Sequence, residues 1–159
     1  MKAEIITIGD ELLIGQVIDT NSAWMAQQLN EIGIEVIQKT CISDEQGQIL
    51  KTLGDASQRA DIILITGGLG PTSDDITKPT LCRFFETDLI LNQSALQNIE
   101  NLLKSRGVPL IEPNRQQAMV PANCTVLQNK LGTAPGMWFE KRGKIVIRMP
   151  GVPIEMMGI

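Results

Sequence analysis

A run of glycines followed by two adjacent aspartates is the segment of this sequence best suited to chemistry. Gly67, Gly68 and Gly70 lie within four residues, and Asp74 and Asp75 follow them. Glycines let the backbone come close to a ligand, so that successive N–H groups can point at one anion, and a helix N-terminus behind them adds its positive end. The glycines therefore predict a phosphate-binding loop. An ordinary strand-to-helix turn is the alternative.

The two aspartates raise a conflict, because carboxylates beside a bare phosphate repel it. A divalent cation held between Asp74 or Asp75 and the phosphates removes this conflict. Since neighbouring loop side chains usually diverge, we expect one aspartate to act as metal ligand or base and the other to cap the following helix. Capping alone would also explain the pair. The glycine spacing matches neither a Walker A loop nor a complete GxGxxG pattern, so it does not identify the ligand.

The composition limits the chemistry and the partners. The chain has no histidine and no tyrosine, which excludes imidazole bases, Ser-His-Asp triads and imidazole-ligated metals. A net charge of −4 and no evident cluster of lysine or arginine argue against nucleic acid as a partner. The apolar runs are too short to span a membrane and no signal peptide is evident, so we expect a cytoplasmic protein.

The elements that must position these residues follow from hydrophobic patterns. We expect strands at Ala3–Ile8, Ile34–Ile42 and Asp61–Thr66, each bounded by glycine or polar residues. Between them, a helix at Asn21–Ile32 ends at a glycine, and a second follows a Ser-x-x-Gln capping box that begins at Ser43. Alternating strands and helices predict an α/β fold, a mostly parallel sheet with helices on both faces.

The second half of the chain continues this pattern. Pro79 is tolerated only in the first turn of a helix, so that helix is expected to begin near Thr77. A further helix begins at the N-cap Asn92, and a short helical turn is expected at 114–119. Three short runs then read as strands, at 125–127, 137–139 and 144–149, the last two as a hairpin. At 159 residues we expect one domain over residues 1–159.

Several polar or glycine-rich segments follow the expected strands. Asp10 and Glu11 come after the first strand, and two stiff segments, 131–136 (LGTAPG) and 149–153 (MPGVP), occur near the end of the chain. Ligands of open parallel sheets bind outside the carboxyl ends of the strands, so these segments are expected to meet the glycine loop. The residues alone predict a site for a phosphate-bearing small molecule, with a metal as an open possibility.

Four motifs in this order, GDELLIGQVIDTNSAWMAQQL, TGGLGPTSDDIT, LGTAPGMW and PGVPIEM, closely resemble the amino-terminal domain of the competence/damage-inducible CinA proteins. That domain is similar to the molybdopterin-binding domains of MoaB, MogA, MoeA and gephyrin. The resemblance runs from the first residue to the last and implies a three-layer α/β/α fold with a mostly parallel sheet. It also implies a homo-oligomer, and the chain is expected to be part of a longer protein with a carboxy-terminal region.

By this resemblance, the domain would be a metal-dependent hydrolase of a nucleotide pyrophosphate, an ADP-ribose pyrophosphatase using a divalent cation such as Mg²⁺, Mn²⁺ or Co²⁺. Asp75, with Asp74 near it, would bind the metal or orient the attacking water. The residues implied in nucleotide and phosphate binding are Asp10, Glu11, Asn21, Gly67, Gly68, Gly70, Thr72, Thr133, Ala134, Pro135, Gly136, Pro150 and Gly151.

Two other functions stay open at this point. The pterin-binding relatives place their ligand in the same region, so molybdopterin binding or adenylyl transfer in molybdenum cofactor biosynthesis is an alternative. Both reactions require in-line attack at phosphorus, and the motif does not separate them. The domain would otherwise be a non-catalytic nucleotide- or pterin-binding module, whose melting temperature rises with ligand while nothing is turned over.

Overall fold

The main β-sheet lies at the centre of the molecule. The computed structural model describes residues 1–68 and 76–159, and within them the sheet has six strands in the order β2-β1-β3-β8-β7-β6. Neighbours from β2 to β8 pair in parallel, whereas β7 is antiparallel to β8 and β6. The strands are β1 (Lys2–Ile8), β2 (Glu35–Ile42), β3 (Ile62–Gly67), β6 (Thr125–Leu127), β7 (Gly136–Lys141) and β8 (Lys144–Met149).

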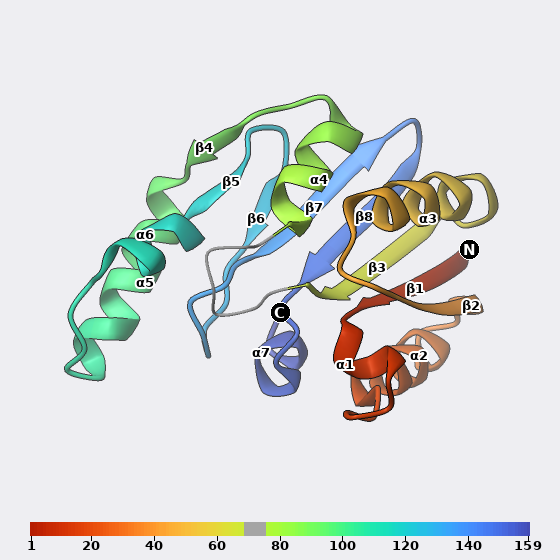
Figure 1. The fold of residues 1–159 in the computed structure, drawn as a ribbon, viewed down its shortest axis with the longest axis horizontal. Coiled ribbons are helices and arrows are strands. Elements are labelled where there is room, and N and C mark those ends of the chain that lie inside the picture. Colours follow the sequence, from red (N-terminus) through yellow and green to blue (C-terminus); the bar gives the residue numbers. More distant parts are fainter. Residues whose placement is uncertain (69–75) are drawn as a thin grey trace.

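Helices cover both faces of this sheet (Figure 1). One face packs against α3 and α4, and the other against α2 and α7. The predicted three-layer α/β architecture with a mostly parallel sheet is therefore confirmed. The helices are α1 (Asp10–Leu13), α2 (Thr20–Glu31), α3 (Gln46–Arg59), α4 (Thr77–Phe85), α5 (Gln93–Ser105), α6 (Glu112–Gln117) and α7 (Pro153–Met157).

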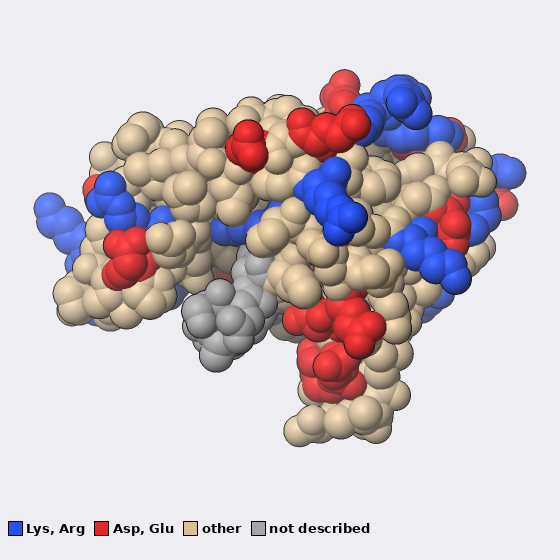
Figure 2. Space-filling model, turned by 45° about the horizontal axis from the view of Figure 1, so that its top comes forward, with Lys and Arg blue, Asp and Glu red and all other residues tan. Residues whose placement is uncertain are grey.

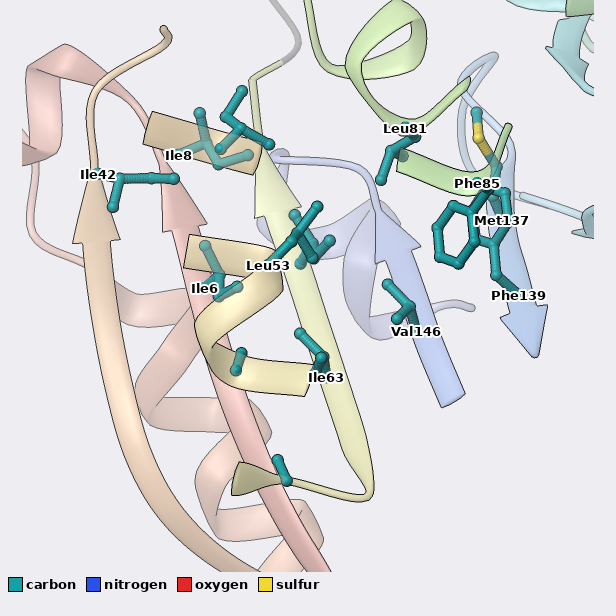
Figure 3. Close-up of a cluster of buried hydrophobic side chains, with 14 of the residues drawn as sticks. Ile6, Ile8, Ile42, Leu53, Ile63, Leu81, Phe85, Met137, Phe139 and Val146 are labelled. Atoms are coloured by element: carbon teal, nitrogen blue, oxygen red, sulfur yellow. The ribbon is translucent and has the colours of Figure 1, made fainter. Parts of the chain in front are cut away.

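The strand sequences explain why two cores form. Side chains of a strand alternate between the two faces of the sheet, and β1 is apolar on both. Ile6 and Ile8 pack with Leu53 of α3 and Leu81 of α4 in one core (Figure 3), whereas Ile5 packs with the α2 core on the opposite face. The parallel strands are thus held firmly, and their carboxyl ends form a fixed edge.

A smaller unit lies beyond the β6 edge of the main sheet (Figure 1). It contains an antiparallel pair of short strands, β4 (Leu89–Leu91) and β5 (Met119–Pro121), beside α5 and α6. The apolar face of α5 packs on Ala118, which precedes β5. Neither strand was predicted from the sequence, because their pairing joins segments about 30 residues apart, which a local pattern does not contain.

Several predicted helix boundaries are confirmed. The helix that contains Pro79 begins at Thr77, and Asn92 caps α5 by accepting a hydrogen bond from the amide of Ala95 at 2.8 Å. Gly33 has the positive φ of 78° that a residue after a helix end often requires. Within residues 1–68 and 76–159, no helix is both long and apolar enough to cross a membrane.

The predicted capping box at Ser43 is wrong. The N-cap of α3 is Glu45, whose backbone is extended and whose side chain makes no cap hydrogen bond, and the helix begins at Gln46. The sequence contains the right residue types, but the helix begins two residues later than the box requires. Asp44 lies in a bend before the helix and lines the cavity described below.

Candidate functional site

A cavity of about 820 Å³ opens at the carboxyl ends of the parallel strands. Its wall includes Thr7–Gly9 at the end of β1, Thr66–Gly68 at the end of β3 and Pro150–Pro153 after β8. The position agrees with the general rule for open α/β sheets, because the loops that leave parallel strands meet at this edge. The volume is that of a small-molecule site.

Gly67 and Gly68 bring their backbone unusually close to the neighbouring strand. Both have positive φ angles, 89° and 66°, and the amide of Gly68 donates to the carbonyl of Ile8 at 3.0 Å. A Cβ atom on Gly67 would overlap that same carbonyl group. Gly151 also packs on Gly67, less closely, since a Cβ on it would lie 3.1 Å from the Cα of Gly67. Three loops therefore meet at a point that has room for backbone only.

A series of buried hydrogen bonds fixes the floor of the cavity. Asn21 is only 9% exposed, and its Nδ2 donates to the carbonyl of Gly151 at 2.8 Å and to Oγ1 of Thr66 at 3.2 Å. The Thr66 hydroxyl donates in turn to the carbonyl of Pro150 at 2.8 Å. These bonds tie α2, β3 and the loop after β8 together. They also fix the orientation of the Asn21 amide, because the carbonyl of Gly151 requires a donor.

Asp19 accepts two hydrogen bonds in the wall of the cavity. Its carboxylate caps α2 by accepting from the amide of Ser22 at 2.9 Å, and it also accepts from the hydroxyl of Thr7 at 3.0 Å. A carboxylate at an N-cap satisfies an amide that has no partner in the helix. The aspartate is therefore held in place, with lone pairs left for a ligand.

The wall is acidic. Its described lining contains the carboxylates of Glu11, Asp19, Asp44 and Glu155 but no lysine or arginine. On the face shown in Figure 2, acidic side chains are grouped on the upper part of a projection whose tip is tan. Among the residues that the structure describes, no three of Asp, Glu and Cys come close enough together to hold a metal ion. These carboxylates are spread around the cavity and suit hydrogen-bond donors on a ligand.

The structure places eight of the predicted binding residues in the cavity wall and three outside it. Asp10 is exposed on α1, and Pro135 and Gly136 are buried outside the lining. Gly70, Thr72, Asp74 and Asp75 lie outside the described residues. The eight in the wall are Glu11, Asn21, Gly67, Gly68, Thr133, Ala134, Pro150 and Gly151.

Sequence reasoning missed several polar residues of the site. Thr7 and Thr66 are hydroxyl side chains at the ends of β-strands, and nothing in their local pattern separates them from ordinary strand residues. Glu155 belongs to the motif PGVPIEM, so its sequence position did carry a signal. Asn129 is 1% exposed and looks in the sequence like a common turn residue.

Three comparisons with known proteins bear on this site. Residues 4–159 match the family model described as "Probable molybdopterin binding domain". A CinA-like protein of Cytophaga hutchinsonii is 52% identical over 157 residues, which are 99% of this chain and 38% of that protein. The chain thus spans well under half the length of this relative.

Solved structures resemble the whole chain. CinA from Thermoplasma acidophilum, a protein of unknown function, is 34% identical, with a TM-score of 0.87 over 98% of this chain and 91% of that one. The tungsten cofactor synthesizing protein MoaB from Pyrococcus furiosus shares the fold at 18% identity, with a TM-score of 0.62 over 99% of this chain and 86% of that one.

Proposed function

Since this chain belongs to the family of probable molybdopterin binding domains, and within it to the CinA-like proteins, we propose that it binds a nucleotide pyrophosphate such as ADP-ribose and hydrolyses it with a divalent cation. The observation that carries this proposal is the cavity where the backbone of Gly67 and Gly68 meets a wall lined by carboxylates. Its size and polarity suit a nucleotide.

Backbone amides have the main role in holding phosphate. The described lining of the cavity offers no lysine or arginine, so an anionic group there depends on N–H donors and on a cation. The positive φ angles of Gly67 and Gly68 turn the backbone at this edge in a way that only glycine adopts readily, although the amide of Gly68 itself donates to the carbonyl of Ile8. Gly70 and Thr72, in the same motif, are proposed to complete this phosphate loop.

Asp75, with Asp74 beside it, is proposed to hold the divalent cation, because the carboxylates described in the wall are too scattered to hold one by themselves. When bound, such a cation neutralises charge on the phosphates and lowers the pKa of bound water. Asp19 and Asn21, which are fixed by Thr7 and Thr66, then orient the nucleoside part of the substrate. Hydrolysis requires little more than this positioning, because in-line attack at phosphorus depends chiefly on alignment and charge.

Molybdopterin binding is the second candidate. The family description supports it, and so does the fold shared with the cofactor-synthesizing MoaB of Pyrococcus furiosus. A pterin is a flat ring system rich in N–H donors, and an acidic wall suits such a group as well as it suits a ribose. A module that binds either ligand without turning it over would use the same cavity.

Release of AMP from ADP-ribose tests the proposal. We expect turnover with at least one cation from a panel of Mg²⁺, Mn²⁺, Co²⁺, Ca²⁺ and Zn²⁺, and loss of turnover in EDTA that fresh metal restores. Calorimetric titration of ADP-ribose into the same preparation separates binding from chemistry. Tight binding with the ligand left intact would exclude hydrolysis and favour the binding module.

We also propose that the protein associates with copies of itself. Four apolar side chains at the end of α1 and in the segment between α1 and α2 are at least half exposed, the last two of them at the rim of the cavity: Leu13, Ile14, Val17 and Ile18. Exposed apolar patches of this kind mark association surfaces. Replacing Ile14 and Ile18 by lysine is expected to lower the molecular mass found by sedimentation equilibrium to that of a monomer. A wild-type chain that is already monomeric at high concentration would contradict this.

A further inference from the structure

Asn129 organises one side of the cavity through all four of its hydrogen bonds. Its Oδ1 accepts from the amides of Leu131 and Gly132 at 3.0 and 2.9 Å. Its Nδ2 donates to the carbonyl of Ala134 at 2.9 Å and to Oε2 of Glu155 at 2.8 Å. Because two amides face one end of the side chain and two acceptors face the other, its orientation has one solution. Asn129 thus shapes the 129–134 loop and joins it to α7.

Glu155 is the acidic residue that this arrangement holds in the wall of the cavity. Its carboxylate lies against Gly132, where a Cβ atom would overlap it. Oε2 accepts from Asn129, while Oε1 receives no hydrogen bond from the described part of the chain. One oxygen is therefore fixed, and the other keeps its capacity to accept.

A purely structural clamp does not require a charge at this position. A neutral glutamine could accept the same hydrogen bond from Asn129, yet the chain has a carboxylate in a wall that already contains three others and no described lysine or arginine. Like charges that share a cavity repel one another, so this arrangement costs stability unless a ligand compensates for it.

An independent observation in the same wall also indicates donors on the ligand. Oδ1 of Asn21 is buried and accepts no hydrogen bond from any described residue, although both protons of its Nδ2 are used. A buried acceptor without a partner is costly, and such groups in native proteins are usually satisfied in the functional state. Since no three carboxylates in the described wall come together around a metal, an organic donor is the fitting partner.

We infer that Glu155 is a further ligand-binding residue, positioned by Asn129, whose carboxylate accepts hydrogen bonds from adjacent donors on the ligand. Vicinal hydroxyls of a ribose and the amino and ring N–H groups of a pterin share this chemistry. The inference rests on the proposed function only in taking this cavity as the ligand site, and it holds whether or not the ligand is hydrolysed.

Glu155→Gln tests the carboxylate, because the amide can still accept from Asn129. Titrations in EDTA, where no metal-dependent turnover occurs, use ADP-ribose, neopterin and inorganic pyrophosphate. We expect the variant to bind ADP-ribose or neopterin about tenfold more weakly, the typical effect of losing a charge-assisted hydrogen bond, with pyrophosphate unchanged within about twofold. Whichever of ADP-ribose and neopterin binds the variant more weakly identifies the donor as a ribose or a pterin. The inference would be overturned if pyrophosphate binding weakened equally, or if the binding of no probe weakened.

The ligand-free protein gives a second readout that needs no probe. If the carboxylate serves the ligand rather than the fold, Glu155→Gln keeps the clamp and removes repulsion, so its melting temperature should equal or exceed that of the wild type by about 1–3 °C. A fall of several degrees would show that the charge stabilises the fold, and would contradict the inference independently of the titrations.

Asn129→Ala tests the positioning role. Asn129→Ala should reduce the preference for the donor-bearing ligand over pyrophosphate as much as Glu155→Gln does. The double variant should lose no more of this preference than either single variant, because the two residues act as one unit. The matched control is Asn98→Ala, which removes a 2.8 Å hydrogen bond to the carbonyl of Asn129 outside the cavity. This control should keep the preference. Additive losses in the double variant would show that Asn129 acts independently of Glu155 and would contradict the positioning role.

Discussion

Replacing Gly67 with alanine is expected to lower the melting temperature by about 10 °C and to abolish ligand binding. Its φ of 89° costs a residue with a side chain about 1–2 kcal/mol, and the added Cβ would overlap the carbonyl group of Ile8. Gly67 pairs with Ile8 in the parallel register of β3 and β1, so the overlap is relieved only if these strands separate. Thermal unfolding followed by circular dichroism measures the effect.

Gly33→Ala is the matched control for this prediction. Gly33 has a similar φ of 78°, but no atom lies within 4 Å of the position that a Cβ would take. Its replacement adds conformational strain alone, which is about 1 kcal/mol and lowers the melting temperature by about 3 °C. Equal losses in the two variants would contradict the proposed role of close backbone approach at the end of β3.

The second large effect is expected at the aspartate pair. Asp75→Asn should reduce AMP release from ADP-ribose by about 100-fold or more, because the amide has the shape of the carboxylate but neither its charge nor its basicity. ADP-ribose should still bind in the absence of metal, since backbone amides and the cavity wall supply most contacts. Initial rates at saturating metal, with binding measured separately, distinguish the two effects.

Asp74→Asn serves as the neighbouring control for Asp75→Asn. Adjacent loop side chains usually diverge, so one aspartate should account for most of the activity, and the loss at Asp74 should stay below about tenfold. A larger loss at Asp74 would reverse the two assignments. If neither substitution changed the rate, the aspartate pair would be excluded from the chemistry.

Local signals predicted much of the fold because they act over a few residues. Gly33, Asn92 and the Pro79 helix follow rules of capping and backbone sterics that need no tertiary information. The capping box at Ser43 has the correct residue types and still fails, because the helix begins only at Gln46, after the N-cap Glu45. Short elements such as β4 and β5 depend on pairing between segments about 30 residues apart, which a local pattern does not contain.

In the site, too, local patterns identified some residues, whereas contacts between distant segments determined how they are held. Motif resemblance pointed to the glycine loop and to Asn21, but the partners that hold Asn21 come from β3 and from the loop after β8. Asp10 and Glu11 look equivalent in the sequence, yet they start the short helix α1, and only Glu11 lines the cavity. Successive residues of a helix point about 100° apart, so two neighbours seldom face one ligand.

Long-range contacts account for the residues that no motif indicated. Asn129 meets Glu155 across 26 residues of sequence, and Thr66 meets Pro150 across 84. Each of these residue types is common in turns or strands, and only the parallel order of β1, β3 and β8 brings them to one edge. Their importance became visible when the strand order placed them around a cavity.

The location of the bound nucleotide tests the central claim most directly. Titrating ADP-ribose into ¹⁵N-labelled protein and following backbone amide signals would map the contact surface at single residues. We expect the largest shifts at Gly67, Gly68, Thr133 and Gly151, with little change in the exposed turn at Gly143. Shifts confined to the α5–α6 unit, or to the opposite edge of the sheet, would show that the nucleotide binds elsewhere and would contradict the account.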